Sequence, residues 1–208
     1  MSPRRDPSRP GASGTAMARE LQFDRETALD LALDQFWSHG FNDTSMRDLA
    51  ARLGVSLSSL YNTFGDKRTM FLAALERYDT QILGRRLDDL ERNHPPLEAV
   101  RCLFESMAAD CAADPVRRGC FLVNTALEMS PHDPDIEREV LAKLGSIEQF
   151  FLRTLGTALS RGDLSRDRDP KVMAAQLLAA LLGIRVLARA NPDPETLDQV
   201  VRGALALL

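Results

Sequence analysis

The 208-residue chain has few aromatic residues, few cysteines and no long uninterrupted apolar run. Aromatic residues make up 6% of it, and its three cysteines stand at positions 102, 111 and 120. An odd number of cysteines without a secretory signal argues against a disulfide framework and indicates a reducing, cytoplasmic setting. The longest apolar stretch, 172–190, is interrupted by one glutamine, one glycine and two arginines, so we expect no membrane-spanning segment.

A basic domain and the common enzyme motifs are also missing. The net charge is −4, and residues 1–70 carry nine Lys or Arg and nine Asp or Glu. Any contact with nucleic acid must therefore depend on where individual charges lie. There is no glycine-rich phosphate loop, no nucleophile elbow and no metal-spaced cluster of His, Cys, Asp and Glu. We therefore predict a protein that is not an enzyme and that uses no cofactor or metal.

Helical periodicity is what the sequence does contain, because apolar residues recur at helical spacing almost everywhere and no strand pattern is visible. Glycine, proline and capping residues divide the pattern into an all-α fold of about nine helices. Residues 1–19 are rich in Pro, Gly, Ser and Arg and predict a disordered arm. We expect a three-helix, helix-turn-helix domain over 20–66 and a larger helical body for ligand binding and dimerisation over 67–208.

Local signals give the approximate bounds of each helix. A helix N-cap is favoured where Ser or Asp precedes an apolar run, and Pro is favoured at the first helical position. Proline and glycine mark most of the ends. The predicted helices cover about 24–38, 46–53, 57–64, 66–93, 97–113, 118–129 and 133–160, with two more beginning after Asp169 and Asp193.

The stretch TSMRDLAARLGVSLSSLYNTFGDK, residues 44–67, places two short amphipathic segments on either side of Gly54. A helix, a short glycine-containing turn and a second helix form a helix-turn-helix. If Leu60 and Phe64 point inward, the other side chains of the second segment face outward, and most of these carry hydroxyls or amides. Such groups suit base edges and phosphates in a major groove. The alternative is a solvated surface helix within an unrelated helical bundle.

The run from Phe41 through Phe71, FNDTSMRDLAARLGVSLSSLYNTFGDKRTMF, resembles the DNA-binding domain of the TetR family of transcriptional regulators. The resemblance covers about a quarter of the chain, and the remainder fits that family in helix number and length alone. It rests on Gly40-Phe41, Thr44-Ser45-Met46, Asp48-Leu49-Ala50, Leu53-Gly54-Val55-Ser56, Leu60-Tyr61, Phe64 and Lys67.

This resemblance implies a homodimer, most often a repressor, that binds a palindromic double-stranded operator and releases it when a small molecule enters the body. It implies that Ser56 caps the recognition helix, that Tyr61 and Asn62 face DNA and that Lys67 meets a phosphate. Leu57-Ser58 stands where members often carry Lys-Gly, so a backbone cation is lost, although Leu57 offers an apolar contact to a thymine methyl. The predicted DNA-binding residues are Thr44, Ser45, Arg47, Ser56, Leu57, Ser58, Ser59, Tyr61, Asn62 and Lys67.

The arm and the neutral charge leave two alternatives open. Arg4, Arg5 and Arg9 suit minor-groove or phosphate contacts, but an unbound disordered tail is the competing interpretation. The neutral N-terminal domain, together with the cation missing at position 57, also permits a dimeric small-molecule-binding protein with weak or lost DNA binding.

Two sets of apolar residues in the body are candidates for a ligand pocket and a dimer interface. Flexible Met and Phe side chains suit an adaptable apolar site, and ordinary core packing is the alternative for each of them. The predicted pocket comprises Phe104, Met107, Cys111, Cys120, Phe121, Asn124, Phe151, Met173 and Gln176. The predicted dimer interface comprises Leu178, Leu181, Arg185, Leu197, Val201 and Leu205, which otherwise would only cap the protomer's own core.

The segment RRGCFLVNTALE, residues 117–128, is similar to the corresponding segment of TetR-like electrophile and oxidant sensors of the NemR type. Cys120 follows two arginines near the start of a predicted helix, and both features favour the reactive thiolate of a cysteine. The alternative is a small buried core thiol. The effector is otherwise unspecified by the sequence, and an electrophile is one hypothesis.

Overall fold

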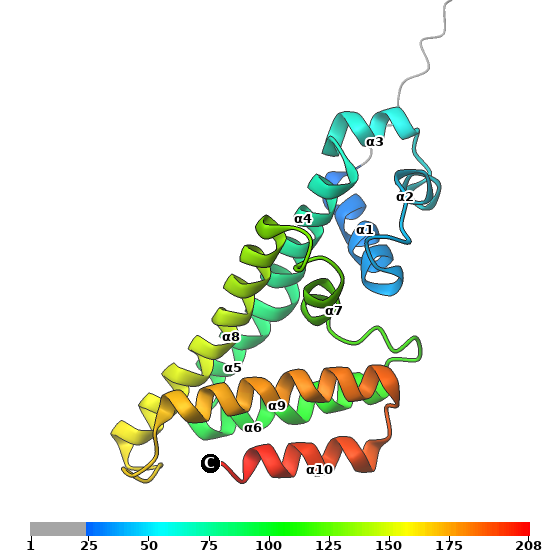
Figure 1. The fold of residues 1–208 in the computed structure, drawn as a ribbon. Coiled ribbons are helices and arrows are strands. Elements are labelled where there is room, and N and C mark those ends of the chain that lie inside the picture. The colour runs from blue at the N-terminus through cyan, green and yellow to red at the C-terminus, as the bar shows by residue number, and fades with distance from the viewer. Residues whose placement is uncertain (1–23) are drawn as a thin grey trace, which may run out of the picture.

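The computed structural model describes residues 24–208, and within this part the chain is helical and contains no strand (Figure 1). The predicted arm, with Arg4, Arg5 and Arg9, lies outside the described residues. α4, a π-helical turn and α5 form one continuous rod, so the described part holds nine separate helical segments. The elements are α1 Arg25–His39, α2 Met46–Leu53, α3 Leu57–Phe64, α4 Lys67–Tyr78, the π-helical turn Asp79–Leu83, α5 Gly84–Asn93, α6 Pro96–Ala113, α7 Phe121–Glu128, α8 Pro134–Arg161, α9 Pro170–Ala190 and α10 Pro194–Leu205.

Capping side chains and one glycine fix the helix-turn-helix in the N-terminal unit. Ser45 and Asp48 form the predicted capping box at the start of α2. Gly54 ends α2 at φ +68°, in the left-handed region that suits glycine. The Ser56 hydroxyl then accepts a hydrogen bond of 3.1 Å from the Ser59 backbone N–H and caps α3. These local interactions place α2 and α3 where the sequence predicts them.

The α4–α5 rod connects the N-terminal unit to the body (Figure 1). Asp66 caps its first turn, and α1 packs along α4. α4 thus completes the core of the N-terminal unit. The domain boundary predicted between residues 66 and 67 stays a prediction. Gly84 follows the π-helical turn, where an added Cβ would stand 3.0 Å from the Asp79 carbonyl oxygen. Glycine thus allows the wide turn at this point.

The body is a bundle in which α9 packs against α6, α8 and α10 (Figure 1). Lys143 on α8 is buried and donates to Glu76 at 2.6 Å and to Asp79 at 3.3 Å. Burial alone would lower the pKa of Lys143, but these two carboxylates more than offset it, so its pKa is raised. The ion pairs therefore hold α8 against the middle of the α4–α5 rod.

The sixth predicted helix begins later than expected, at Phe121 instead of residue 118. Asp114 ends α6, and its carboxylate accepts hydrogen bonds from the backbone N–H groups of Val116 and Arg118. Arg117 and Gly119 have φ values of +51° and +70°, which are incompatible with a right-handed helix. Residues 114–120 therefore form a loop between α6 and α7.

Composition alone would allow α9 to cross a bilayer, contrary to the expectation from its polar interruptions. Its apolar 18-residue window has a mean hydropathy of 1.7, and 39% of that window is buried within the protomer. Core helices of soluble proteins have the same composition. It packs against α6, α7, α8 and α10 within the bundle, and a large part of its surface stays uncovered.

Candidate functional site

α3 lies at one end of the molecule and presents a polar face (Figure 1). Leu60 and Phe64 are buried as predicted, with 0% and 5% of their surfaces exposed. This turns Ser58, Tyr61 and Asn62 to the outside, and Tyr61 is 46% exposed. The helix therefore offers a hydroxyl, a phenol and an amide on a surface that the body leaves open.

The first turn of α3 is built around the Ser56 hydroxyl. Its oxygen lies 2.9 Å from the Ser58 hydroxyl and 2.8 Å from the Ser59 hydroxyl, besides capping the helix. Ser56 is thus a cap, as expected, while Ser59 is half-buried. Leu57 is also half-buried and packs against the core, so only part of its side chain is open to a base.

Two of the predicted DNA-binding residues have other roles. Thr44 is 1% exposed, and its hydroxyl donates to the Gly40 carbonyl at 2.8 Å, so the prediction of a side-chain contact with DNA is wrong for this residue. Lys67 donates to the Phe41 carbonyl at 2.9 Å and lies 4.1 Å from the centroid of the Phe41 ring. The ammonium of Lys67 is therefore already engaged by the α1–α2 turn.

The remaining residues of the set lie at the start of α2. Ser45 is exposed, and its hydroxyl is held at 2.5 Å from the Asp48 carboxylate. Arg47 is exposed, and between residues 24 and 208 it forms no ion pair, whereas Arg52 is paired with Asp34. Arg47 is thus the cation of α2 that stays available to an anionic partner.

Two interactions fasten the N-terminal unit to the body. The Glu128 carboxylate on α7 accepts hydrogen bonds from the backbone N–H groups of Phe41 at 3.0 Å and Asn42 at 2.7 Å. Arg68 at the start of α4 forms a bidentate pair with Asp133, the capping residue of α8, at 2.7 and 2.9 Å. The position of the helix-turn-helix is therefore tied directly to α7 and α8.

The loop 114–120 provides a further connection. Arg118 pairs with Asp34 on α1 at 3.0 Å and with Asp114 at 3.3 Å. Its guanidinium also stacks over Trp37, 4.5 Å from the ring centroid, while the Trp37 indole N–H donates to the Gly119 carbonyl at 3.3 Å. The loop thus bridges α1 to α6 and α7.

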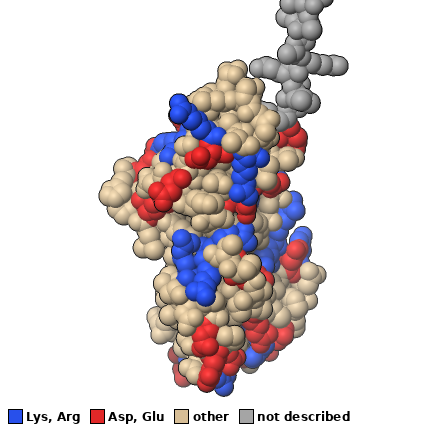
Figure 2. All heavy atoms as spheres, turned by 90° about the vertical axis from the view of Figure 1, so that its right-hand side faces the viewer, with Lys and Arg blue, Asp and Glu red and all other residues tan. Residues whose placement is uncertain are grey.

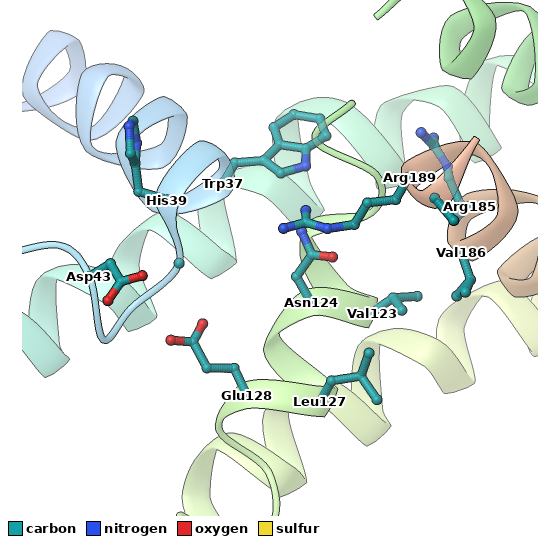
Figure 3. A pocket seen from close by; sticks show the side chains of 12 residues that line it. Trp37, His39, Asp43, Val123, Asn124, Leu127, Glu128, Arg185, Val186 and Arg189 are labelled. Atoms are coloured by element: carbon teal, nitrogen blue, oxygen red, sulfur yellow. The ribbon is translucent and has the colours of Figure 1, made fainter. Parts of the chain in front are cut away.

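A cavity of about 570 Å³ lies at the junction of the N-terminal unit, α7 and α9 (Figure 3). The Arg189 side chain extends toward Asn124 and Trp37 in this cavity. Both Asn124 and Arg189 donate to the Arg118 carbonyl, at 2.8 and 2.5 Å. Its lining residues are Trp37, His39, Gly40, Asp43, Val123, Asn124, Leu127, Glu128, Arg185, Val186, Arg189 and Ala190.

A second cavity, of about 320 Å³, shares Trp37 and Arg185 with the first and is more strongly charged. The loop 114–120 forms part of its lining. On this side of the molecule, basic side chains gather midway between the N-terminal unit and the lower end of the body (Figure 2). Its lining residues are Trp37, Ile82, Arg86, Asp110, Cys111, Ala113, Asp114, Pro115, Arg117, Arg118, Gly119, Arg185 and Ala188.

Most of the predicted pocket residues are core residues instead. Asn124 lines the larger cavity and Cys111 the smaller one. Gln176 is exposed on α9, so the prediction that it points inward is wrong. The others are buried at 6% exposure or less and line neither cavity: Phe104, Met107, Cys120, Phe121, Phe151 and Met173. Their aromatic rings and thioethers fill space between the helices, which is the packing alternative.

Arg185 is a candidate functional residue of these cavities, although its sequence context predicts a place in a dimer interface. Its guanidinium turns into the protomer, where it contacts the Met107 sulfur and lies 3.5 Å from the Cys111 sulfur. Its Nε is buried and has no hydrogen-bond partner. Its spacing in the sequence could have indicated this inward orientation, because Arg185 follows the buried Leu181 by four residues on an apolar helix.

Cys111 and Cys120 are buried thiols. Cys120 immediately precedes α7, is 6% exposed, and has its sulfur 3.7 Å from the Tyr78 hydroxyl. Arg118, the neighbouring cation in the sequence, is neutralised by two carboxylates. Burial raises the pKa of the Cys111 thiol. In this structure neither thiol has the exposure that a reactive thiolate needs, and sensing through Cys120 stays a prediction.

The predicted dimer-interface residues mostly serve the protomer's own core. Leu181, Leu197 and Val201 are 1%, 1% and 6% exposed, and Leu178 and Leu205 are half-buried. The apolar stripe of α10 packs on α6 and α9, which is why it is not available to a partner. The exposed apolar side of α9 carries Val172, Val186 and Leu187 instead, at 54%, 48% and 39% exposure.

Family models match both parts of the chain. Residues 28–74 match the model described as bacterial regulatory proteins, tetR family, and residues 96–204 match the tetracyclin repressor-like C-terminal domain. The chain is 32% identical to the uncharacterised HTH-type transcriptional regulator YezE of Bacillus subtilis, over 92% of this chain and 100% of YezE. It is 28% identical to the HTH-type transcriptional repressor ComR of Escherichia coli, over 91% of this chain and 90% of ComR.

A solved structure with similar sequence contains DNA. It is a cysteine mutant of the TetR family transcriptional regulator CifR, complexed with 26-bp double-strand operator DNA. The TM-score is 0.80 at 31% sequence identity, and the match covers 89% of this chain and 97% of the CifR chain. The similarity thus extends over the helix-turn-helix and the body together.

Proposed function

This chain belongs to the TetR family and is a DNA-binding transcriptional regulator, and from that premise we propose that it represses transcription as a homodimer on a palindromic operator. We further propose that a small molecule bound in its body releases it from the operator. The observation that supports the proposal most directly is α3, which turns Ser58, Tyr61 and Asn62 outward while its other side is buried.

Recognition of DNA would then use groups that the structure leaves open. Asn62 and Tyr61 supply donors and acceptors for base edges in the major groove. The first turn of α3 directs backbone N–H groups toward a phosphate, and Arg47 adds a cation. The net charge of the N-terminal domain is close to zero, which favours a DNA interface with few phosphate contacts. The complex of CifR with operator DNA supports this assignment of partner.

Dimerisation would bury the exposed side of α9. Val172, Ala175, Ala179 and Val186 are all exposed. On a helix of 3.6 residues per turn their spacing puts them on one face, with the small Gly183 beside them. Small side chains let two helices approach closely, and a symmetric pair of such faces is self-complementary. A homodimer would thereby cover the part of α9 that its own protomer leaves open.

Release of the operator would act through the junction between the N-terminal unit and the body. Both cavities touch the N-terminal unit at Trp37, and Glu128, which lines the larger one, holds the α1–α2 turn. A molecule that displaces α7 or the loop 114–120 would therefore shift the helix-turn-helix relative to the α9 dimer face. Because the two recognition helices of a dimer must match the spacing of the half-sites, a small shift would weaken operator binding. Repression itself is supported by the similarity to ComR, a repressor.

Fluorescence anisotropy tests this function directly. The full-length protein is titrated into labelled DNA from upstream of its own gene, over a series of salt concentrations, with shuffled DNA of the same length as control. We expect tight binding to the upstream DNA that weakens with salt. The same titration is repeated with tiled fragments of the flanking region. If the protein binds all of these DNAs equally weakly, operator binding is contradicted and the alternative of a ligand carrier without DNA function is favoured.

A further inference from the structure

We propose that the smaller cavity binds a small organic carboxylate, and that its carboxylate group pairs with the guanidinium of Arg185. The inference deepens the proposed function because it names the chemical class of the effector. Its core, an anion site at Arg185, does not depend on DNA binding.

Arg185 is a half-buried cation without a counter-charge. Its Nε is shielded from solvent and has no hydrogen-bond partner, and its two terminal nitrogens contact the sulfur atoms of Met107 and Cys111. Sulfur is a weak acceptor and cannot replace the water that a guanidinium loses on burial. Within residues 24–208, no carboxylate lies within ion-pair distance of Arg185. The site therefore contains an unbalanced positive charge.

The ionisable neighbours of Arg185 do not supply the missing negative charge. Burial raises the pKa of the Cys111 thiol and raises the pKa of the Tyr78 phenol, so both groups stay neutral at physiological pH. Asp110 is the nearby carboxylate, but it pairs with Arg86 at 2.6 Å. An anion from outside the chain would balance the charge of Arg185.

The walls of the smaller cavity indicate what kind of anion fits. Four arginines and two aspartates line it, and two of the arginines, Arg86 and Arg118, are paired with those aspartates. Trp37, Ile82 and Ala188 add apolar surface. A volume of about 320 Å³ holds a small molecule, and the apolar part of its lining favours an organic carboxylate over a fully hydrated inorganic anion.

A carboxylate would suit Arg185 in geometry as well as in charge. The guanidinium presents parallel N–H donors that match two carboxylate oxygens. In a site shielded from water such a pair is stronger than at the surface. Because Arg185 and Trp37 line both cavities, a ligand here would also contact the residue that joins α1 to the loop 114–120.

Trp37 allows the binding to be measured without DNA, since it is the single tryptophan of the chain and lines the cavity. The full-length protein is titrated with acetate, butyrate and benzoate, and separately with acetamide, butyramide and benzamide, at constant ionic strength. Tryptophan fluorescence and the melting temperature are recorded. The variants are Arg185→Met and, as the control at an exposed cation of the same helix that lines neither cavity, Lys171→Met. Inorganic phosphate is included as a second anion.

We expect at least one carboxylate to change the fluorescence saturably and to raise the melting temperature of the wild type and of Lys171→Met. The rise should be roughly 3–6 °C for each tenfold increase in ligand above its dissociation constant. The amides should have no effect, and Arg185→Met should lose the response. Without ligand, Arg185→Met should melt no lower than the wild type, since it removes an unpaired, half-buried charge.

The proposal is overturned if no carboxylate stabilises the wild type more than Arg185→Met, or if phosphate alone does so. It is also overturned if the wild type shows a thiolate absorbance that Arg185→Met lacks, because the chain's own thiol would then be the counter-ion. Operator release is scored separately by anisotropy. Carboxylate binding in a protein that binds no operator would contradict the proposed function while supporting the anion site.

Discussion

The carboxylate of Glu128 accepts a hydrogen bond of 3.0 Å from the backbone N–H of Phe41, and thereby joins the last turn of α7 to the turn between α1 and α2. Its other oxygen accepts from the N–H of Asn42 at 2.7 Å. The contact is close, because a Cβ added to Gly40 would stand 2.9 Å from the same carboxylate. The helix-turn-helix and α7 are therefore coupled by one side chain that also lines the larger cavity.

Replacing Glu128 by glutamine should loosen this coupling. One acceptor oxygen would become an NH₂ group facing a backbone N–H, so either the half-buried Phe41 donor or the exposed Asn42 donor would lose its charged partner. We expect the free energy of unfolding to fall by about 1–3 kcal/mol, measured by urea denaturation. Operator release by an effector should also weaken. Glu105→Gln on the exposed side of α6 is the control, and equal unfolding curves for both variants would show that the contact contributes nothing.

Asn62→Ala should weaken operator binding without affecting the fold. Asn62 is exposed on α3, and loss of a bidentate contact with a base costs about 1–3 kcal/mol. We therefore expect the affinity for the operator to fall roughly tenfold or more, with an unchanged melting temperature. Asn93→Ala, at the exposed end of α5, is the matched control. An operator affinity as high as that of the control would remove Asn62 from the interface.

Val186→Asp should separate the proposed dimer. Val186 is 48% exposed on the apolar face of α9, so a carboxylate there would be tolerated in a protomer and repelled by its symmetric copy. Sedimentation velocity should show a monomer, and operator binding should be lost. Leu141→Asp on α8, where the leucine is 60% exposed, should leave the association unchanged. A dimeric Val186→Asp variant would place the interface elsewhere.

The ion pair between Arg68 and Asp133 should make the stability of the fold depend on pH in the acid range. The Arg68 guanidinium holds the pKa of the Asp133 carboxyl well below its usual range. A lowered pKa in the folded state gives stabilisation that is complete above the unfolded value of about 3.9 and is lost as the pH falls through the folded pKa. Asp133→Asn retains a helix cap but lacks this pair.

The melting temperature of Asp133→Asn should therefore lie below that of the wild type at neutral pH, and the difference should shrink below about pH 4. Asp163→Asn, in the exposed loop after α8, provides the comparison for a carboxylate without such a pair. A difference that stays constant with pH would mean that the substitution acts on packing and not on the ion pair.

The helix-turn-helix could be predicted from the sequence because its signals act over a few residues. The Ser45–Asp48 capping box, Gly54 and the Ser56 cap each depend on hydrogen bonds or backbone angles within one turn of the chain. The same locality explains the start of α8 at Asp133-Pro134. It also explains the error at residues 118–120, where hydrogen bonds to the Asp114 carboxylate hold the backbone in a loop although the sequence pattern is helical.

The side that each helix buries could not be predicted in the body. α9 is apolar on nearly every side, so its sequence did not distinguish the face that meets α6 and α8 from the face that stays open. Arg185 was assigned to the wrong face for this reason. Likewise Thr44 and Lys67 have the residue types of a DNA contact, but Thr44 is buried and Lys67 binds the carbonyl of a residue 26 positions away.

The sequence by itself determined the all-helical fold, most helix ends and the family, since caps, turns and apolar spacing are local properties of the chain. Tertiary structure alone decided that the larger cavity lies at the junction of α1, α7 and α9, that the predicted aromatic pocket is solid core, and that Arg185 is left without a counter-charge. The physical reason is that burial and pairing depend on groups brought together from distant parts of the chain, such as Trp37 and Gly119.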